Sequence, residues 1–207
     1  MKLVVFGATG GIGARVVEQG LAAGHDVTAV ARRPEAISVK HRRLTVVQGD
    51  VLSPQKLPAI IAGQDAVVSA VGARDRGPTT VYSAGASNVM QAMTAAGVRR
   101  IIAISASGLE PGPVWQRVVA KQVLWRVFKY MYADLVLMEQ ALSASDLDWT
   151  ILRPPQLTDG PCTGHYQIAI NRHLSHGSKL SRADTADYIL KHLSDPATYH
   201  GVVEVAY

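Results

Sequence analysis

Apolar residues follow two alternating patterns along the chain, and these patterns predict its secondary structure. The run Lys2–Phe6 is almost continuously apolar, whereas the next segment places Val16, Val17 and Leu21 at helical spacing. Continuous short apolar runs are typical of strands that are buried on both faces of a parallel sheet. Apolar runs and amphipathic segments then alternate along the chain, which predicts a doubly wound α/β fold with right-handed crossovers.

The same patterns locate the remaining elements. Further strands are predicted at Asp26–Ala31, 43–48, 65–70, Arg100–Ile104, Asp148–Arg153 and 202–205, with a short one at 165–170. Helices are predicted at 54–61, 78–95, 114–142 and 182–193, the third of them broken near Tyr132. Pro78 and Gly97 are start and stop signals for the second of these helices. Ser181 with Asp184 three residues later is an N-cap pair for the last helix.

A glycine-rich turn joins the first strand to the first helix. Gly7 permits a tight turn, Gly10 lets the backbone approach a pyrophosphate, and Gly13 brings the helix close to the strand. The free N–H groups and the positive end of the helix then face the phosphates. This placement predicts dinucleotide binding by a Rossmann-like parallel sheet, and a tight turn that binds nothing is the alternative.

Arg32 and Arg33 follow the second strand, where sites that prefer NAD carry an acidic residue. Asp26 lies at the other end of that strand, and Glu35 comes after Pro34. A guanidinium fork suits a 2′-phosphate, so the sequence predicts NADP(H) as the cofactor. The alternative is a pair of solvated arginines on a loop.

Composition excludes several classes of protein. The 207 residues are 48% hydrophobic and 18% charged, which suits one folded domain, 1–207, and argues against disorder. The single cysteine, Cys162, excludes an internal disulfide and fits a reducing, cytoplasmic compartment. We expect no signal peptide, no membrane span and, despite the net charge of +5, no nucleic-acid partner.

Several candidate side chains follow the carboxyl ends of predicted strands, where parallel sheets bind ligands. Asp50 and Val51 come after the third strand and are expected beside the adenine. Ser105 and Ser107 come after the fifth, where each is either aimed into the cleft or bonded to nearby backbone. Residues 154–181, with the last helix and strand, are expected to form a small substrate wall. Its histidines lack the spacing of metal ligands, so no metal is predicted.

The predicted helix at 114–133 carries four cations and no acidic residue, together with three tryptophan or phenylalanine side chains. Its basic residues do not share one face, which argues against a membrane-surface helix. One interpretation is that this helix packs against the core and extends its Lys and Arg side chains to solvent. The other is that it forms a partner or dimer surface. We therefore expect a monomer or a weak homodimer.

Seven short motifs, spread over nearly the whole chain, together resemble those of one family. They are 6–10 (FGATG), 49–52 (GDVL), 62–67 (AGQDAV), 78–81 (PTTV), 154–155 (PP), 163–164 (TG) and 199–201 (YHG). The chain resembles the short-chain dehydrogenase/reductase superfamily in its atypical, NmrA-like branch of small NAD(P)H-binding proteins. Within that branch it is most similar to the biliverdin-IXβ reductase or NADPH-flavin reductase type.

The resemblance implies a role for each matching position. It assigns the phosphates, the 2′-phosphate, the adenine, the cofactor groove and the nicotinamide pocket to residues of this chain. The residues for the phosphates are Gly7, Thr9, Gly10, Ile12 and Gly13, and the residue for the 2′-phosphate is Arg32. Asp50 and Val51 would lie at the adenine, Gly72 and Arg74 in the cofactor groove, and Pro154 with Gln156 in the nicotinamide pocket. Gly11 and Arg33, which adjoin these residues, are further candidates for cofactor binding.

The chain departs from the family at its proton donors. Met131 and Leu135 occupy the positions of the Tyr-x-x-x-Lys pair, and Ala106 occupies that of the serine. Gln156 stands where the biliverdin-IXβ type has histidine. The remaining catalytic candidates are Ser105, Ser107, Gln156 and Tyr132, the last of which flanks the tyrosine position.

These observations predict an NADPH-dependent oxidoreductase that transfers hydride to a flavin, a quinone, a tetrapyrrole or a similar conjugated acceptor, with the cofactor supplying the chemistry. The alternative is a non-catalytic NADP(H)-binding redox sensor of the NmrA-like type, which the missing proton donors would also suit. An epimerase or dehydratase of nucleotide sugars would need the Tyr/Lys pair and a larger substrate region.

Overall fold

The computed structural model describes residues 1–107, 114–174 and 176–207, apart from the side chains of 114–127. Eight strands form one sheet in the order β3-β2-β1-β4-β5-β6-β10-β8, and β7 pairs with β9 in a second, two-stranded sheet. In the large sheet β8 is antiparallel to β10, and every other pairing is parallel. The predicted doubly wound parallel sheet is therefore confirmed.

Most strands begin and end within a residue or two of the sequence prediction. Their bounds are β1 Lys2–Phe6, β2 Asp26–Ala31, β3 Leu44–Gln48, β4 Ala66–Ser69, β5 Arg100–Ile104, β6 Asp148–Arg153, β7 Gln156–Thr158, β8 Gln167–Ile170, β9 Lys179–Ser181 and β10 Gly201–Ala206. The strands β7 and β9 were not predicted, because each has three residues and is defined by pairing with the other.

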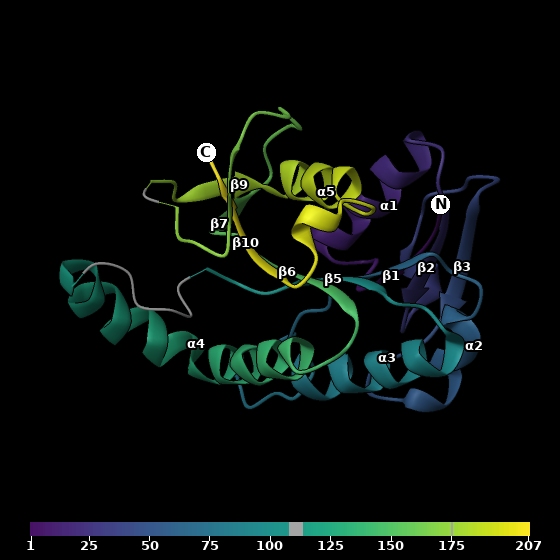
Figure 1. Cartoon of the computed structure of the whole chain (residues 1–207), viewed down its shortest axis with the longest axis horizontal. Helices are drawn as coiled ribbons and strands as arrows, with labels where there is room; N and C mark the ends of the chain where they lie inside the picture. Colours follow the sequence, from purple (N-terminus) through teal and green to yellow (C-terminus); the bar gives the residue numbers. More distant parts are fainter. Residues whose placement is uncertain (108–113, 175) are drawn as a thin grey trace.

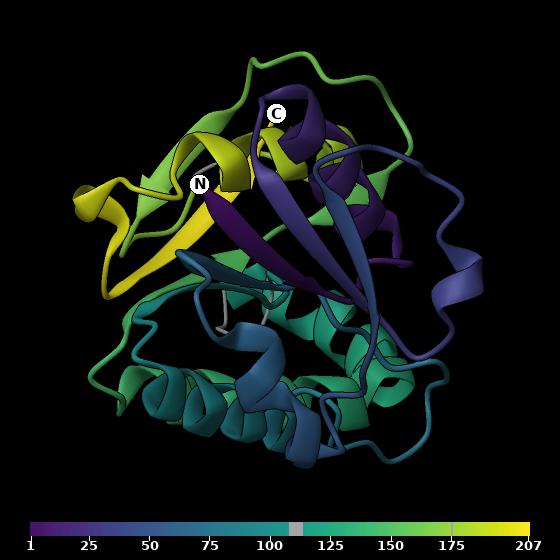
Figure 2. The same cartoon turned by 90° about the vertical axis from the view of Figure 1, so that its right-hand side faces the viewer.

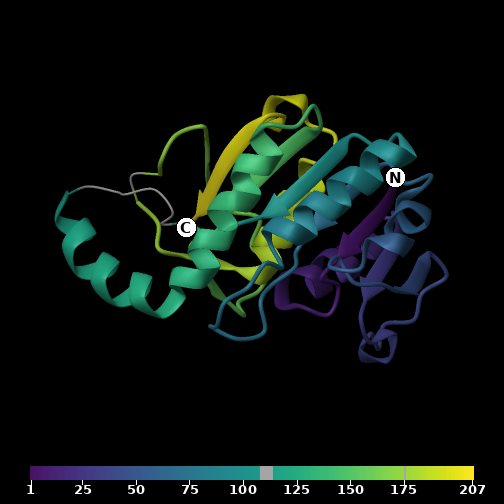
Figure 3. The same cartoon turned by 90° about the horizontal axis from the view of Figure 1, so that it is seen from below.

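Helices cover both faces of the sheet, as Figures 1 and 2 show. One face carries α1 (Gly11–Ala22) and α5 (Arg182–Lys191), and the other carries α2 (Leu57–Ile61), α3 (Ser83–Ala96) and α4 (Val114–Ser143). Figure 3 shows α3 and α4 lying side by side beneath the sheet, where they pack together. Short 3₁₀ turns lie at Pro34–Ala36, Pro54–Lys56 and Pro196–Thr198.

The central strand β1 shows why the sheet is buried on both sides. Leu3 and Val5 belong to the cluster beneath α1 and α5, whereas Val4 and Phe6 belong to the cluster that packs against α2, α3 and α4. All four side chains are at most 1% exposed. Since neighbouring residues of a strand point to opposite faces, a continuous apolar run is needed here, as the sequence predicted.

The helix α3 begins at Ser83, so the predicted start at Pro78 was wrong. The buried carboxylate of Asp134 in α4 accepts hydrogen bonds from the backbone N–H groups of Tyr82 (2.9 Å) and Ser83 (3.2 Å), and from the Ser83 hydroxyl. A side chain from another helix thus caps the N-terminus of α3. The end at Gly97 was predicted correctly, with φ +69° at that residue.

The helix α4 runs unbroken past Tyr132, so the predicted break was also wrong. Asp134, Leu135 and Met138 are buried at helical spacing immediately after it, which keeps one face of the helix on the core. Of the predicted basic and aromatic side chains at 114–133, those at 114–127 lie outside the described side chains. Among the described residues, no helix is both long enough and apolar enough to cross a membrane.

Two buried arginines join the layers through their guanidinium groups. Arg100 in β5 donates to the carbonyls of His192 and Leu193 at the end of α5, and burial lowers its pKa to about 10. Arg153 in β6 donates to Glu139 of α4 through Nε (2.9 Å) and through its terminal nitrogen (2.5 Å). Both arginines are at most 6% exposed, so these contacts attach a helix to each face of the sheet.

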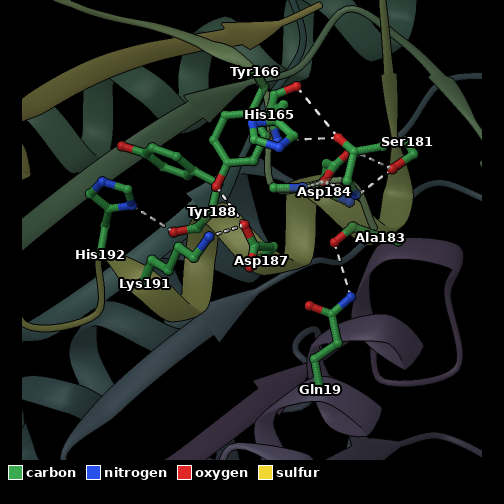
Figure 4. Close-up of polar contacts among 12 residues, drawn as sticks. Gln19, His165, Tyr166, Ser181, Ala183, Asp184, Asp187, Tyr188, Lys191 and His192 are labelled. Carbon is green, nitrogen blue, oxygen red and sulfur yellow. Dashed lines mark hydrogen bonds and ion pairs between the residues drawn. The ribbon is translucent and has the colours of Figure 1, made fainter. Parts of the chain in front are cut away.

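Asp184 is the centre of a polar cluster at the start of α5 (Figure 4). Its backbone N–H donates to Ser181 as the predicted N-cap (2.8 Å), and its carboxylate accepts from Tyr207, from the N–H groups of Thr163 and Gly164, and from the Thr163 hydroxyl. Burial alone would raise the pKa of Asp184, but these hydrogen bonds outweigh it and lower the pKa to about 2.

The lowered pKa predicts how stability depends on pH. Because the pKa of Asp184 falls from 3.8 to about 2 on folding, its ionised form stabilises the protein above pH 4, and the contribution is lost as pH falls toward 2. Asp184→Asn should therefore cost about 2 kcal/mol at pH 7, with the difference from wild type shrinking below pH 4. Urea unfolding of both proteins between pH 7 and pH 2 measures this difference. Glu18→Gln on the exposed face of α1 is the control, and equal stability of wild type and Asp184→Asn at pH 7 would contradict the prediction.

Candidate functional site

A cleft of about 400 Å³ lies at the carboxyl ends of the parallel strands. Each of the first five strands contributes to it. The residues at or just after the strand ends are Phe6 and Gly7 for β1, Ala31 and Arg32 for β2, Gly49 and Asp50 for β3, Ala70 for β4, and Ile104 and Ser105 for β5. This position matches the ligand site expected for a doubly wound sheet.

The glycine-rich turn has the close contacts that its spacing predicts. Gly7 has φ +77°, and a Cβ atom there would lie 2.2 Å from the carbonyl oxygen of Ala70. A Cβ atom on Gly13 would lie 2.1 Å from the carbonyl oxygen of Gly7. Side chains are therefore excluded at both positions, in agreement with the tight turn and the close helix packing expected there.

The start of α1 fits a diphosphate group. Thr9, Gly10, Gly11 and Ile12 line the cleft, whereas Gly13 lies behind them. The helix has no side-chain cap at Gly10 and no acidic residue in its first turn. Its first N–H groups and its positive end are thus open to an anion, because Gly10 and Gly11 carry no side chain that would block one.

Arg32 lines the cleft at the end of β2, and Arg33 does not. The guanidinium group of Arg32 is exposed and forms no hydrogen bond or ion pair with any residue that the structure describes. Asp50 and Val51 also line the cleft, as predicted for residues beside an adenine. The Asp50 carboxylate accepts from the N–H of Leu52 (3.0 Å), which fixes its position.

The end of β4 adds a residue that sequence reasoning missed. Gly72 lines the cleft, but the predicted Arg74 is exposed and does not. Tyr82 does line it, is 7% exposed, and accepts a hydrogen bond from the N–H of Ala73 at 3.1 Å. Burial raises the pKa of Tyr82, so its hydroxyl stays protonated and can donate a hydrogen bond. The only sequence signal was the motif at 78–81 immediately before it.

The other end of the cleft is apolar. Met131, Leu135 and Ala106 all line it, the three positions at which the family carries Tyr, Lys and Ser. Ile104 and Leu157 are further apolar lining residues. None of these five residues is ionisable, and the ionisable side chains in the described lining are those of Arg32, Asp50, Tyr82 and Arg182.

Ser105 lines the cleft, but its proton is directed elsewhere. Its hydroxyl donates to Oε1 of Glu139 at 2.6 Å, and the same carboxylate accepts from Arg153. The oxygen of Ser105 can still accept a hydrogen bond from a ligand. Ser107 does not line the cleft, and its N–H donates to the carbonyl of Pro154 at 2.9 Å. Ser107 is therefore not aimed into the cleft, and this main-chain bond does not involve its hydroxyl.

The structure does not bring Pro154, Gln156 or Tyr132 into the cleft lining. Gln156 is exposed, and the next residue, Leu157, lines the cleft in its place. Neighbouring residues of a strand point to opposite faces, so β7 turns Leu157 inward and Gln156 outward. Tyr132 is half-buried and meets Phe128 edge-on, with ring centroids 6.4 Å apart.

A second group of acidic and sulfur atoms lies away from the cleft. Cys162, Asp184 and Asp187 each have a potential metal-ligating atom within 4.8 Å of the others. Figure 4 shows that the carboxylates already have partners, since Asp187 accepts from Tyr166 (2.7 Å) and pairs with Lys191 (2.8 Å). These contacts account for the cluster as part of the packing of α5.

Comparison with known proteins identifies the family and agrees with the observed fold. The NAD(P)H-binding family model matches residues 7–196. The UPF0659 protein C216.03 of Schizosaccharomyces pombe is 30% identical over 98% of this chain and 88% of its own. ChuY, an anaerobillin reductase from Escherichia coli O157:H7, is 28% identical with a TM-score of 0.78, covering 100% of this chain and 97% of that one.

A third similarity concerns the fold alone. A wide-type short-chain dehydrogenase/reductase from Veillonella parvula, whose structure is a complex with NADP, has a TM-score of 0.82 at 20% identity. It covers 100% of this chain and 94% of that one. The family match, the sheet order and the glycine-rich turn agree, and we conclude that the chain belongs to the NAD(P)H-binding family.

Proposed function

We propose that this protein is an NADPH-dependent oxidoreductase whose acceptor is a flavin, a quinone or a similar conjugated molecule. The observation that carries the proposal is the apolar end of the cleft. Met131, Leu135 and Ala106 line it where relatives that reduce simple carbonyls need a proton donor. A conjugated acceptor needs no such donor, because it spreads the incoming charge over its ring system.

Two observations support NADPH as the reductant. Arg32 lines the cleft with an unengaged guanidinium group, and no acidic residue closes β2 to bind a ribose 2′-hydroxyl. A related fold has been solved with NADP, and ChuY is described as a reductase. Of these two proteins, only ChuY favours a reductase role, and it does not specify the acceptor.

The chain's own residues would bind and orient rather than protonate. A bound NADPH supplies the hydride. The start of α1 would hold the phosphates, Tyr82 can donate a hydrogen bond, and the oxygen of Ser105 can accept one. Leu157 and Met131 would exclude water from the reacting rings, and the proton would come from solvent at the open side of the cleft.

A non-catalytic NADP(H) sensor is the second candidate, favoured by the same lack of a proton donor. It would show tight dinucleotide binding without turnover on any acceptor. We retain the expectation of a cytoplasmic monomer or weak homodimer for both candidates.

Cofactor preference tests the role of Arg32. A charge-assisted contact with the 2′-phosphate contributes about 1.5–3 kcal/mol, so NADPH should bind roughly ten- to a hundredfold more tightly than NADH. Arg32→Ala should remove most of this difference, and Arg33→Ala is the matched control, because Arg33 does not line the cleft. Fluorescence titration measures the dissociation constants of both nucleotides for wild type and the two variants. Equal affinities for the two nucleotides in wild type would contradict the assignment.

Acceptor choice tests the apolar end of the cleft. NADPH oxidation should proceed with FMN, FAD or a quinone and should be negligible with simple ketones, whose developing alkoxide needs a donor. Stopped-flow absorbance at the nicotinamide band measures both rates. Because hydrogen bonding only positions the acceptor, Ser105→Ala should reduce the rate by a modest factor. Ser107→Ala and Gln156→Ala should leave the rate unchanged, because neither residue lines the cleft.

Two results would count against the proposed reaction. A thousandfold loss in Tyr82→Phe or Tyr132→Phe would identify a catalytic acid that the proposal lacks. Tight NADPH binding without oxidation by any conjugated acceptor would favour the sensor.

A further inference from the structure

Arg182, the first residue of α5, extends across the N-terminus of α1. A Cβ atom added to Gly11 would lie 2.5 Å from Cδ and 2.6 Å from Nε of Arg182, so the arginine occupies the space of a side chain at that position. Arg182 also lines the cleft together with Gly10 and Ile12. It therefore lies beside the turn that fits a diphosphate group.

The backbone at Arg182 is held on both sides. Ser181 forms the N-cap bond with Asp184, and Gln19 of α1 donates to the carbonyl of Ala183 at 3.0 Å (Figure 4). These contacts fix the distance between α5 and the start of α1. A change of partner for Arg182 therefore requires only rotation of its side chain.

The charges around Arg182 favour an anion. The N-terminus of α1 carries partial positive charge that no acidic residue in its first turn offsets, and Arg182 adds a full positive charge beside it. The ion-pair partner of Arg182 is Asp159, at 2.6 Å. The Asp159 side chain is 83% exposed, and exposed ion pairs are weak.

We propose that Arg182 binds the pyrophosphate of the dinucleotide and that Asp159 is the partner it leaves when the dinucleotide enters. A guanidinium group matches phosphate oxygens with two parallel hydrogen bonds, whereas Asp159 competes for it from solvent. The inference rests on the dinucleotide binding of the proposed function and is independent of the acceptor. The proposal gives the two arginines different roles. Arg32 would bind the 2′-phosphate, which only NADP(H) carries, and Arg182 would bind the pyrophosphate, which NADP(H) and NAD(H) share.

Dissociation constants for three probes distinguish the two arginines. Arg182→Ala should raise the dissociation constants of NADPH and NADH by the same factor, about tenfold or more, and leave that of adenosine 2′-monophosphate unchanged. Arg32→Ala should weaken NADPH and adenosine 2′-monophosphate and spare NADH. Isothermal titration calorimetry measures each value.

Asp159→Asn tests the competing ion pair. It should tighten binding of both dinucleotides by up to about fivefold, and this gain should vanish in the double variant Asp159→Asn/Arg182→Ala. Arg15→Ala is the matched control, because Arg15 is an exposed arginine of α1 that pairs with Glu18 and does not line the cleft. It should change neither constant.

The proposal fails if Arg182→Ala and Arg182→Gln, each with the melting temperature of wild type, bind NADH as wild type does. It also fails if Arg182→Ala weakens NADPH alone, because the shared pyrophosphate would then not be its partner. If Arg182→Ala unfolds, Arg182→Gln and Asp159→Asn decide the question. Every readout is a binding equilibrium, so the outcome does not depend on whether any acceptor is reduced.

Discussion

The close approach of three backbone segments at Gly7 is the constraint on which the rest of the structure depends. A Cβ atom added to Gly7 would lie 2.2 Å from the carbonyl oxygen of Ala70. A Cβ atom added to Gly13 would lie 2.1 Å from the carbonyl oxygen of Gly7. The strands β1 and β4 and the helix α1 can therefore meet only where side chains are missing. The same omission leaves the positive end of α1 open toward the cleft, so tight packing and anion binding have one cause.

A buried carboxylate determines the character of the opposite end of the cleft. Glu139 takes two hydrogen bonds from Arg153 and one from Ser105, which turns the proton of the cleft serine toward α4. Replacing only one partner of such a buried pair leaves an uncompensated charge, so single substitutions of Glu139 or Arg153 destabilise the fold. Met131 and Leu135 form an apolar wall of the cleft, and this wall suits the proposed acceptors, which need no protein acid.

The features that the sequence predicted correctly are those that depend on neighbouring residues in the chain. The central strands followed from continuous apolar runs, and the cap at Ser181 followed from the residue three positions later. The start of α3 was missed because Asp134 caps it from another helix. Gln156 was assigned to the nicotinamide pocket from the family resemblance, whereas Leu157 lines the cleft. The facing of β7 depends on its pairing with β9, which no short motif specifies. Tyr82 and Arg182 reach the cleft through tertiary packing, so nothing in their neighbouring residues marked them clearly.

The contact between Gly11 and Arg182 has a consequence for how the protein folds. It joins the first helix to the last one, so the anion-binding end of the cleft is complete only after nearly the whole sequence has been incorporated. A partly folded chain that lacks α5 would present the glycine-rich turn without its arginine. Ligand that binds only the finished cleft stabilises the fully folded state by mass action. The concentration of dinucleotide around the protein would thereby influence how long each molecule survives proteolysis, apart from any reaction it performs.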